Sequence, residues 1–133
     1  MSDTRYHRNA GSVFSLKYHL VWCPKYRREV LVGEVAEDLR TLLYQKAKEL
    51  DVKIEALEIM PDHVHLFIQS DPTEAPQRLA NQFMGYTSRL LLEKFPELRS
   101  RLPGLWSRSY YVGTIGHVSD ESVRRCIEMQ KSG

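Results

Sequence analysis

Apolar side chains recur along this sequence with two different periods, and the order in which the periods change restricts the fold more than any other feature. A period of two residues is typical of a strand with one buried face, whereas a period of about 3.6 is typical of an amphipathic helix. Residues 14–22 alternate in the first way and predict a half-buried strand. Its polar face would carry Ser15, Lys17 and His19. Helical spacing then predicts a helix over residues 33–50.

The middle of the chain predicts a hairpin followed by a second helix. Residues 53–60 and 64–70 are rich in strand-forming side chains, and Pro61-Asp62 between them is a turn pair that favours an antiparallel hairpin. Apolar side chains at helical spacing continue from Leu79 to Leu91. This helix should end before Pro96, because the residue before a proline avoids helical geometry.

The last part of the chain predicts a fourth strand and a final helix. Residues 105–115 are rich in Trp, Tyr and Val, and Ser119 is a good N-cap for a helix that follows. The order βαββαβα is that of an α+β, ferredoxin-like fold with one added C-terminal helix, in which helices cover an antiparallel four-stranded sheet. We find no internal repeat or linker, so residues 1–133 are expected to form a single domain.

Composition excludes several classes of protein. The charged share is 27%, and no apolar run approaches the roughly 18 residues of a membrane span, so we expect neither a disordered chain nor a membrane protein. The N-terminal residues lack the apolar core of a signal peptide, which favours a cytoplasmic protein. Cys23 and Cys126 form neither a disulfide framework nor a zinc-ligand spacing, so both are expected to be free thiols.

The charge distribution leaves the question of a nucleic-acid partner open. The formal net charge of +2 is too small to indicate such a partner by itself. Basic residues are clustered locally, however, with Lys25, Arg27 and Arg28 around Tyr26. On charge alone, a solvated mixed surface and a binding patch are about equally plausible.

His63 and His65 give the clearest chemical signal. Residues two apart on a strand point the same way, so both imidazoles can be offered to one ion. Asp62 beside them is a candidate for an extra ligand or for a group that orients a ligand. Imidazoles combined with oxygen ligands suit Mg²⁺ or Mn²⁺. The alternative is that both histidines contact only water or backbone groups.

The predicted C-terminal helix places Cys126 and Gln130 on one face with apolar anchors. Val123, Cys126, Ile127 and Gln130 follow the spacing i, i+3, i+4, i+7. The amide oxygen of Gln130 is a candidate third metal ligand. The alternative is a solvated helix end, and spacing alone favours this second interpretation.

Several motifs, taken in order, resemble one known family. They are Tyr18-His19-Leu20-Val21-Trp22 with Lys25-Tyr26-Arg27-Arg28, then Met60-Pro61-Asp62-His63-Val64-His65-Leu66, then Trp106-Ser107-Arg108-Ser109-Tyr110-Tyr111-Val112, and finally Ile127-Glu128-Met129-Gln130. From about Phe14 to Gln130 the chain resembles TnpA, the single-tyrosine HUH transposases of the smallest bacterial and archaeal insertion sequences. Agreement of several ordered motifs is far more specific than H-x-H alone.

This resemblance implies a dimeric enzyme that binds imperfect hairpins at the ends of a single-stranded DNA element. In the family a tyrosine attacks the scissile phosphate and leaves a 5′-phosphotyrosine and a free 3′-OH, and a later attack by another 3′-OH rejoins the strands. His63 and His65 match the paired metal ligands, and Gln130 matches the third ligand. The DNA contacts that we expect are Lys25, Tyr26, Arg27, Arg28, Arg89, Arg108 and Arg124.

The family's tyrosine lies four residues before the glutamine, and Cys126 occupies that position here. A thiolate is nucleophilic, and its pKa of about 8.5 is below that of tyrosine. Its sulfur is closer to the backbone than a tyrosine oxygen, and a displacement of about 1 Å can cost on the order of a hundredfold in rate. The sequence therefore predicts a strand transferase with an impaired chemical step. The alternatives are a non-catalytic hairpin-binding protein and, less favoured, a histidine-triad phosphohydrolase, which would need a histidine in place of Phe67.

Two tyrosines of the fourth-strand motif are further candidates for the nucleophile. They are Tyr110 and Tyr111. Both are more simply explained as residues that pack in the fold or stack on DNA.

Overall fold

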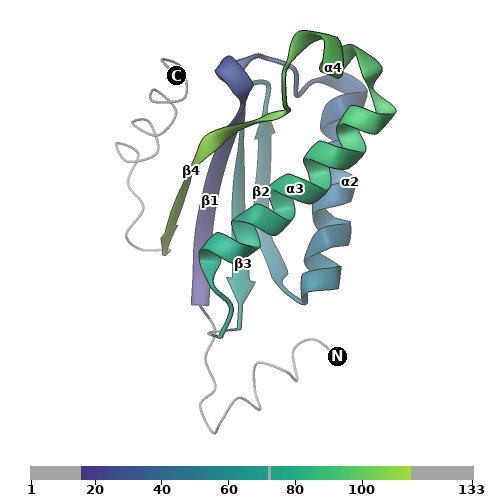
Figure 1. Cartoon of the computed structure of the whole chain (residues 1–133). Helices are drawn as coiled ribbons and strands as arrows, with labels where there is room; N and C mark the ends of the chain where they lie inside the picture. The colour runs from purple at the N-terminus through teal and green to yellow at the C-terminus, as the bar shows by residue number, and fades with distance from the viewer. Residues whose placement is uncertain (1–15, 72, 115–133) are drawn as a thin grey trace, which may run out of the picture.

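A computed structural model of the chain describes residues 16–71 and 73–114 (Figure 1). Its elements are β1 (Leu16–Pro24), the 3-10 turn η1 (Lys25–Arg27), α2 (Gly33–Leu50), β2 (Lys53–Met60), β3 (His63–Ser70), α3 (Pro76–Lys94), α4 (Pro96–Arg101) and β4 (Trp106–Thr114). The predicted order βαββαβ is confirmed, with one short helix added. The predicted last helix lies outside the described residues, and with it Arg124, Cys126 and Gln130.

The four strands form one antiparallel sheet in the order β2-β3-β1-β4. β3 and β1 are therefore the inner strands, and β2 and β4 are the edges. This is the ferredoxin-like arrangement that the sequence predicts. α2 and α3 lie side by side across one face of the sheet (Figure 1). We call the opposite face, which carries His19, His63 and His65, the histidine face.

β3 determines which side chains reach the histidine face. Its residues alternate strictly between buried and partly exposed, and Val64, Leu66 and Ile68 have no exposed surface. These three side chains pack beneath the helices, and each such burial contributes about 1.5–3 kcal/mol. A register slip of one residue would turn every side chain to the other face. The core of the protein therefore fixes the direction of His63 and His65.

β1 differs from the half-buried strand that the sequence predicts. All of its residues except the first two are buried, and only 3% of His19 is exposed. The reason is the position of β1 inside the sheet, where large side chains from its neighbours cover its histidine face. Phe67 of β3 stacks on His19, and Tyr111 of β4 packs against Val21 and Cys23. The prediction of an exposed polar face was wrong for His19.

The end of α3 is as predicted, but the chain continues at once into α4. α3 ends at Lys94, and Pro96 is the first residue of α4. Proline is favourable there because its missing N–H would have no helical partner and its φ already suits a helix. α4 buries Leu98 in the core. Its six residues are too few to show a helical period in the sequence.

Among the described helices, none is long and apolar enough to cross a membrane.

Candidate metal centre

The two histidines of the H-x-H motif are brought together at the start of β3. A turn at Pro61-Asp62 precedes the strand, so His63 is its first residue and His65 follows on the same face. Their ring centroids are 4.8 Å apart, and the ring planes meet at 71°. The pleat of one strand therefore presents two imidazoles as neighbours, as the motif predicts.

His63 is oriented by the residue that precedes it. Its Nδ1 is hydrogen-bonded to Oδ1 of Asp62 at 2.7 Å, and the second oxygen of that carboxylate accepts a hydrogen bond from Nε of Arg27 at 2.6 Å. Arg27 comes from η1, at the end of β1, so two separate segments fix this imidazole. A carboxylate can only accept, so Nδ1 of His63 donates this hydrogen bond, and in the neutral ring the lone pair lies on Nε2.

His65 is held in a comparable way by a third histidine. Its Nδ1 lies 3.1 Å from Nε2 of His19. The antiparallel register pairs Val21 with His65, which places His19 one diagonal step away on the same face. The sequence analysis assigned no role to His19, because only the register between β1 and β3 brings it to His65. Within the described part of the chain, neither Nε2 of His63 nor Nε2 of His65 has a hydrogen-bond partner.

The protonation states of this cluster suit metal ligation. Burial lowers the pKa of His65, the charge of His63 lowers it further, and Glu58 opposes the change. Burial, and then the charge of His65, lower the pKa of His19 to about 4. Burial acts to raise the pKa of Asp62, but hydrogen bonds from His63 and Arg27 outweigh it and hold that pKa below its usual value. The lowered pKa values favour neutral imidazoles at His19 and His65 beside an ionised Asp62, and a metal-binding histidine must be neutral.

The donor set fits part of a site for a divalent ion. Metal-binding histidines generally use one ring nitrogen for the ion and donate from the other to an orienting group, as Asp62 allows for His63. Both oxygens of Asp62 are already engaged. Over residues 16–71 and 73–114, no group of three or more His, Cys, Asp or Glu side chains could hold an ion. A third ligand of these types would therefore have to come from outside these residues.

Residues 25–28, which we call the basic turn, adjoin this cluster. Tyr26 and Arg27 both have left-handed backbone conformations, with φ of 59° and 54°. Such a conformation costs a residue other than glycine about 1–2 kcal/mol, and it needs support from the surrounding structure. The backbone N–H of Lys25 donates to the carbonyl of Leu105 at 2.9 Å, which anchors the turn. Tyr26 is 52% exposed, so this strained turn presents an aromatic ring to its surroundings.

The other predicted DNA contacts are spread over the molecule. Arg108 is exposed on the edge strand β4. Arg89 lies on α3, in the helix layer on the other side of the sheet from the histidines, 4.0 Å from Glu93. The structure therefore brings Arg27 to the site and does not bring Arg89 there.

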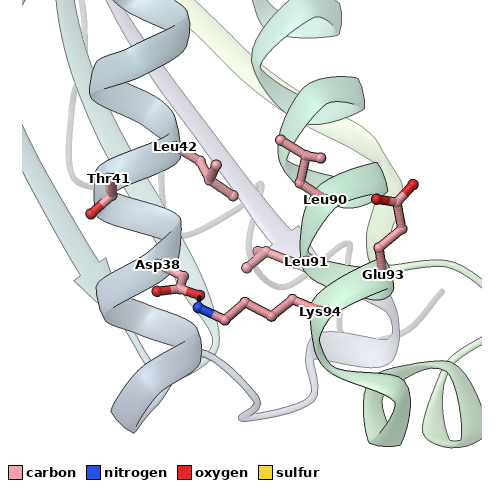
Figure 2. A pocket seen from close by; sticks show the side chains of 7 residues that line it. All are labelled: Asp38, Thr41, Leu42, Leu90, Leu91, Glu93 and Lys94. Carbon is pink, nitrogen blue, oxygen red and sulfur yellow. Dashed lines mark ion pairs between the residues drawn. The ribbon is translucent and has the colours of Figure 1, made fainter.

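A hollow of about 460 Å³ lies between α2 and α3, away from the histidine face. Figure 2 shows Lys94 of α3 reaching across it to Asp38 of α2, and leucines of both helices line it. None of the predicted site residues contributes to this hollow.

An antiparallel ferredoxin-like sheet with an H-x-H pair on the face opposite its helices defines, by fold and site, an HUH-type domain. The family model described as "Transposase IS200 like" matches residues 12–130. The chain therefore belongs to the IS200-like transposase family, and the resemblance found in its motifs is confirmed.

Individual relatives agree with this assignment. ISDra2 transposase TnpA of Deinococcus radiodurans is 36% identical over 125 residues, which cover 92% of this chain and 89% of the relative. The transposase for insertion sequence element IS200 of Salmonella typhimurium is 30% identical over 109 residues, which cover 80% of this chain and 72% of the relative.

Solved structures are similar as well. A crystal structure of a transposase from Deinococcus radiodurans has a TM-score of 0.86 and 34% identity, covering 92% of this chain and 96% of that one. A REP-associated tyrosine transposase bound to a REP hairpin has a TM-score of 0.57 at 12% identity, covering 85% of this chain and 62% of that one. This second likeness concerns the fold alone.

Proposed function

We propose that this transposase binds hairpin ends of single-stranded DNA and holds one divalent ion, Mg²⁺ or Mn²⁺, on its histidine face for strand cleavage and rejoining. The observation that carries the proposal is that both imidazoles use Nδ1 for a hydrogen bond within the protein. Nδ1 of His63 is committed to Asp62, and Nδ1 of His65 is committed to His19. Nε2 is therefore the ring nitrogen that each histidine has without a partner among the described residues, and the one that can face an ion. Membership of the family supports the class of substrate.

The residues divide into ligands and orienting groups. His63 and His65 would hold the ion, Gln130 would add its amide oxygen, and Asp62 would orient His63 because both of its oxygens are engaged. When bound, the ion supplies positive charge that polarises the scissile phosphate and stabilises the charge that develops there.

The basic turn is the proposed contact for DNA next to the scissile phosphate. Arg27 links this turn to the histidines through Asp62, so Lys25 and Arg28 lie in the segment that adjoins the site. Their charges would neutralise backbone phosphates, and the exposed ring of Tyr26 would stack on an unpaired base. Arg89, Arg108 and Arg124 remain predicted contacts.

The chemical step determines what this particular chain can do. In cleavage the nucleophile attacks phosphorus, the bond from phosphorus to the 3′-oxygen breaks, and that oxygen takes up a proton and leaves as a 3′-hydroxyl. Cys126 occupies the nucleophile position, and its sulfur is nearer the backbone than a tyrosine oxygen. We expect the chain to bind its hairpin and to cleave very slowly or not at all, because losing the nucleophile affects the transition state more than binding.

A non-catalytic hairpin-binding protein is the second candidate, and Cys126 is the observation that favours it. Replacing Cys126 by tyrosine separates the two candidates. A strand transferase regains cleavage and a covalent adduct, whereas a pure binding protein does not.

We also propose a two-fold dimer in which the C-terminal helix of each chain completes the partner's site. The described residues supply two imidazoles but no group of three His, Cys, Asp or Glu ligands, and the edge strands β2 and β4 carry backbone groups that a second chain can pair with. Light scattering tests the stoichiometry. Mixing a His65→Ala chain with a Gln130→Ala chain should restore Mn²⁺ binding at one of the two sites of each mixed dimer if the sites are shared between chains.

Calorimetric titration with Mn²⁺ tests the metal site directly. The full chain should bind one ion per site, and a variant with both His63→Ala and His65→Ala should not. Equal binding by the two proteins would remove the histidines from the site.

A further inference from the structure

His19 is a buried histidine that lies behind one of the proposed metal ligands. Only 3% of it is exposed, and its ring stacks on Phe67 with centroids 4.1 Å apart and an angle of 8° between the planes. The ring of Tyr111 meets it edge-on at 6.1 Å. These contacts hold the imidazole of His19 in place, with Nε2 at 3.1 Å from Nδ1 of His65.

The direction of this hydrogen bond decides what His65 can bind. If Nε2 of His19 donates, Nδ1 of His65 is the acceptor, and the proton of the neutral His65 ring is on Nε2. That ring then has no lone pair for an ion. If Nδ1 of His65 donates, its Nε2 carries the lone pair, and Nε2 of His19 is the acceptor.

His63 provides the comparison within the same site. Its partner, Asp62, is a carboxylate of lowered pKa and can only accept, so His63 is held with its lone pair on Nε2. His65 adopts the same tautomer only when His19 accepts. Two neighbouring ligands would then be matched by two different orienting groups, one a carboxylate and one an imidazole.

The remaining nitrogen of His19 agrees with a role other than packing. Nδ1 of His19 is buried and has no hydrogen-bond partner among the residues that the structure describes. A buried polar atom without a partner destabilises a fold by about 1–3 kcal/mol, so an apolar side chain would serve better if the position only filled space. Phe67 and Tyr111 already surround the site with aromatic rings.

We propose that His19 is the positioning residue of His65: it accepts a hydrogen bond from Nδ1 of His65 and thereby presents Nε2 of His65 to the metal ion. This inference rests on the proposed metal site. It adds a residue of β1 to a site whose other described members come from β3, the preceding turn and η1. The ring of His19 does not touch the ion in this arrangement.

Two substitutions at His19 separate positioning from packing. His19→Gln keeps an acceptor near the position of Nε2. His19→Leu removes both ring nitrogens and fills the position with an apolar side chain. By calorimetry with Mn²⁺ on the full chain, we expect His19→Leu to weaken binding about 10–100-fold and His19→Gln to retain most of the affinity. Thermal unfolding with a chelator present should show that His19→Leu is no less stable than wild type.

A purely structural role makes a different prediction. In that case His19→Leu and His19→Gln would lose metal affinity only as far as they lose thermal stability, and the glutamine would not rescue binding. Equal Mn²⁺ affinity of wild type and His19→Leu would overturn the proposal.

Nitrogen NMR of wild type gives a readout that needs no variant at His19. In protein saturated with diamagnetic Mg²⁺, the imidazole of His65 should carry its proton on Nδ1. A proton on Nε2 would contradict the proposal.

His63→Ala is the reference that separates failure of this inference from failure of the proposed function. If wild type binds no Mn²⁺, or binds no better than His63→Ala, the metal site itself fails and the role of His19 fails with it. If His63→Ala abolishes binding and His19→Leu does not change it, only the role of His19 is wrong.

Discussion

Nε of Arg27 and Oδ2 of Asp62 lie 2.6 Å apart, and the other oxygen of the same carboxylate is 2.7 Å from Nδ1 of His63. One side chain therefore joins the basic turn to the first proposed metal ligand. The two side chains of this ion pair are 25% and 17% exposed, so solvent and salt screen it only in part. We therefore expect changes in the basic turn to affect His63 through this carboxylate.

Arg27→Met should weaken Mn²⁺ binding as well as DNA binding. Without its guanidinium partner, Asp62 is free to rotate and no longer fixes the ring of His63, and loss of such an orienting group typically costs about 10–100-fold in metal affinity. Calorimetry measures the effect. Arg28→Met is the matched control, because Arg28 is exposed in the same turn; it should weaken DNA binding and leave Mn²⁺ affinity unchanged. Equal Mn²⁺ affinity of both variants would show that Arg27 does not act through Asp62.

Thr87→Val should destabilise the fold without touching the site. Oγ1 of Thr87 accepts a hydrogen bond from Nε1 of Trp106 at 3.0 Å and donates to the carbonyl of Phe83 at 2.8 Å, inside the core between α3 and β4. Valine has the same shape but leaves the indole N–H buried without a partner, which costs about 1–3 kcal/mol. Urea unfolding should show this loss. Thr87→Ser keeps the hydroxyl and should lose clearly less than Thr87→Val; an equal loss would mean that the methyl group of Thr87 contributes as much as its hydrogen bond.

Acid should destabilise the metal-free protein in a window that His19 sets. The pKa of His19 is about 4 in the fold against 6.5 for the free side chain, mainly because of burial. Between these values the unfolded chain binds more protons, so the free energy of unfolding falls as pH falls from about 6.5 to 4, by about 2–3 kcal/mol in all. Above pH 6.5 the contribution of His19 to stability is fully retained. Below pH 4 this residue causes no further loss of stability.

Urea unfolding of wild type and His19→Leu, both with a chelator, measures this dependence. The difference between the two proteins between pH 6.5 and 5, before most carboxylates titrate, isolates the histidine. A pH slope as steep in His19→Leu as in wild type would assign the effect to other groups.

The fold follows from the sequence wherever a hydrophobic period is long enough to read. The alternation of Val64, Leu66 and Ile68 specified both the strand and the face that His63 and His65 occupy. α4 was not predicted because it has only six residues and begins at a proline that signals only the end of α3. The left-handed conformations of Tyr26 and Arg27 were not predicted because neither residue type favours them.

Only the residues of the candidate site that lie close together in the sequence could be predicted. His63, His65 and Asp62 are consecutive or nearly so, and strand geometry alone brings them together. His19 is 46 residues from His65, and its contact depends on the register between two inner strands, which local patterns do not contain. The sequence suggested two roles for Asp62, and its two engaged oxygens favour the orienting one.

Binding should favour hairpin-bearing single strands over matched duplex and should weaken as salt rises. Arginine and lysine contacts to phosphates release counterions, so the logarithm of affinity should fall linearly with the logarithm of salt concentration. Gel shifts with hairpins from the flanking DNA element measure both properties. Arg28→Met should reduce the slope of this salt dependence. Lys48→Met removes an exposed charge on α2 and should leave the slope unchanged. Tighter binding to plain duplex than to any hairpin would contradict the proposed substrate.

The measurement that tests the account most directly is cleavage of a labelled single strand, carrying the element's hairpin end, by the Cys126→Tyr protein with Mg²⁺ or Mn²⁺. Denaturing gels and intact mass should show cleavage and a 5′-linked covalent adduct, both absent or very slow with the cysteine protein and both lost when His63→Ala and His65→Ala are added. Nucleophile loss in other enzymes costs many orders of magnitude, so the contrast should be large. No cleavage by Cys126→Tyr on a hairpin that it binds would contradict the account, as would rapid cleavage by the cysteine protein with an adduct on its thiol.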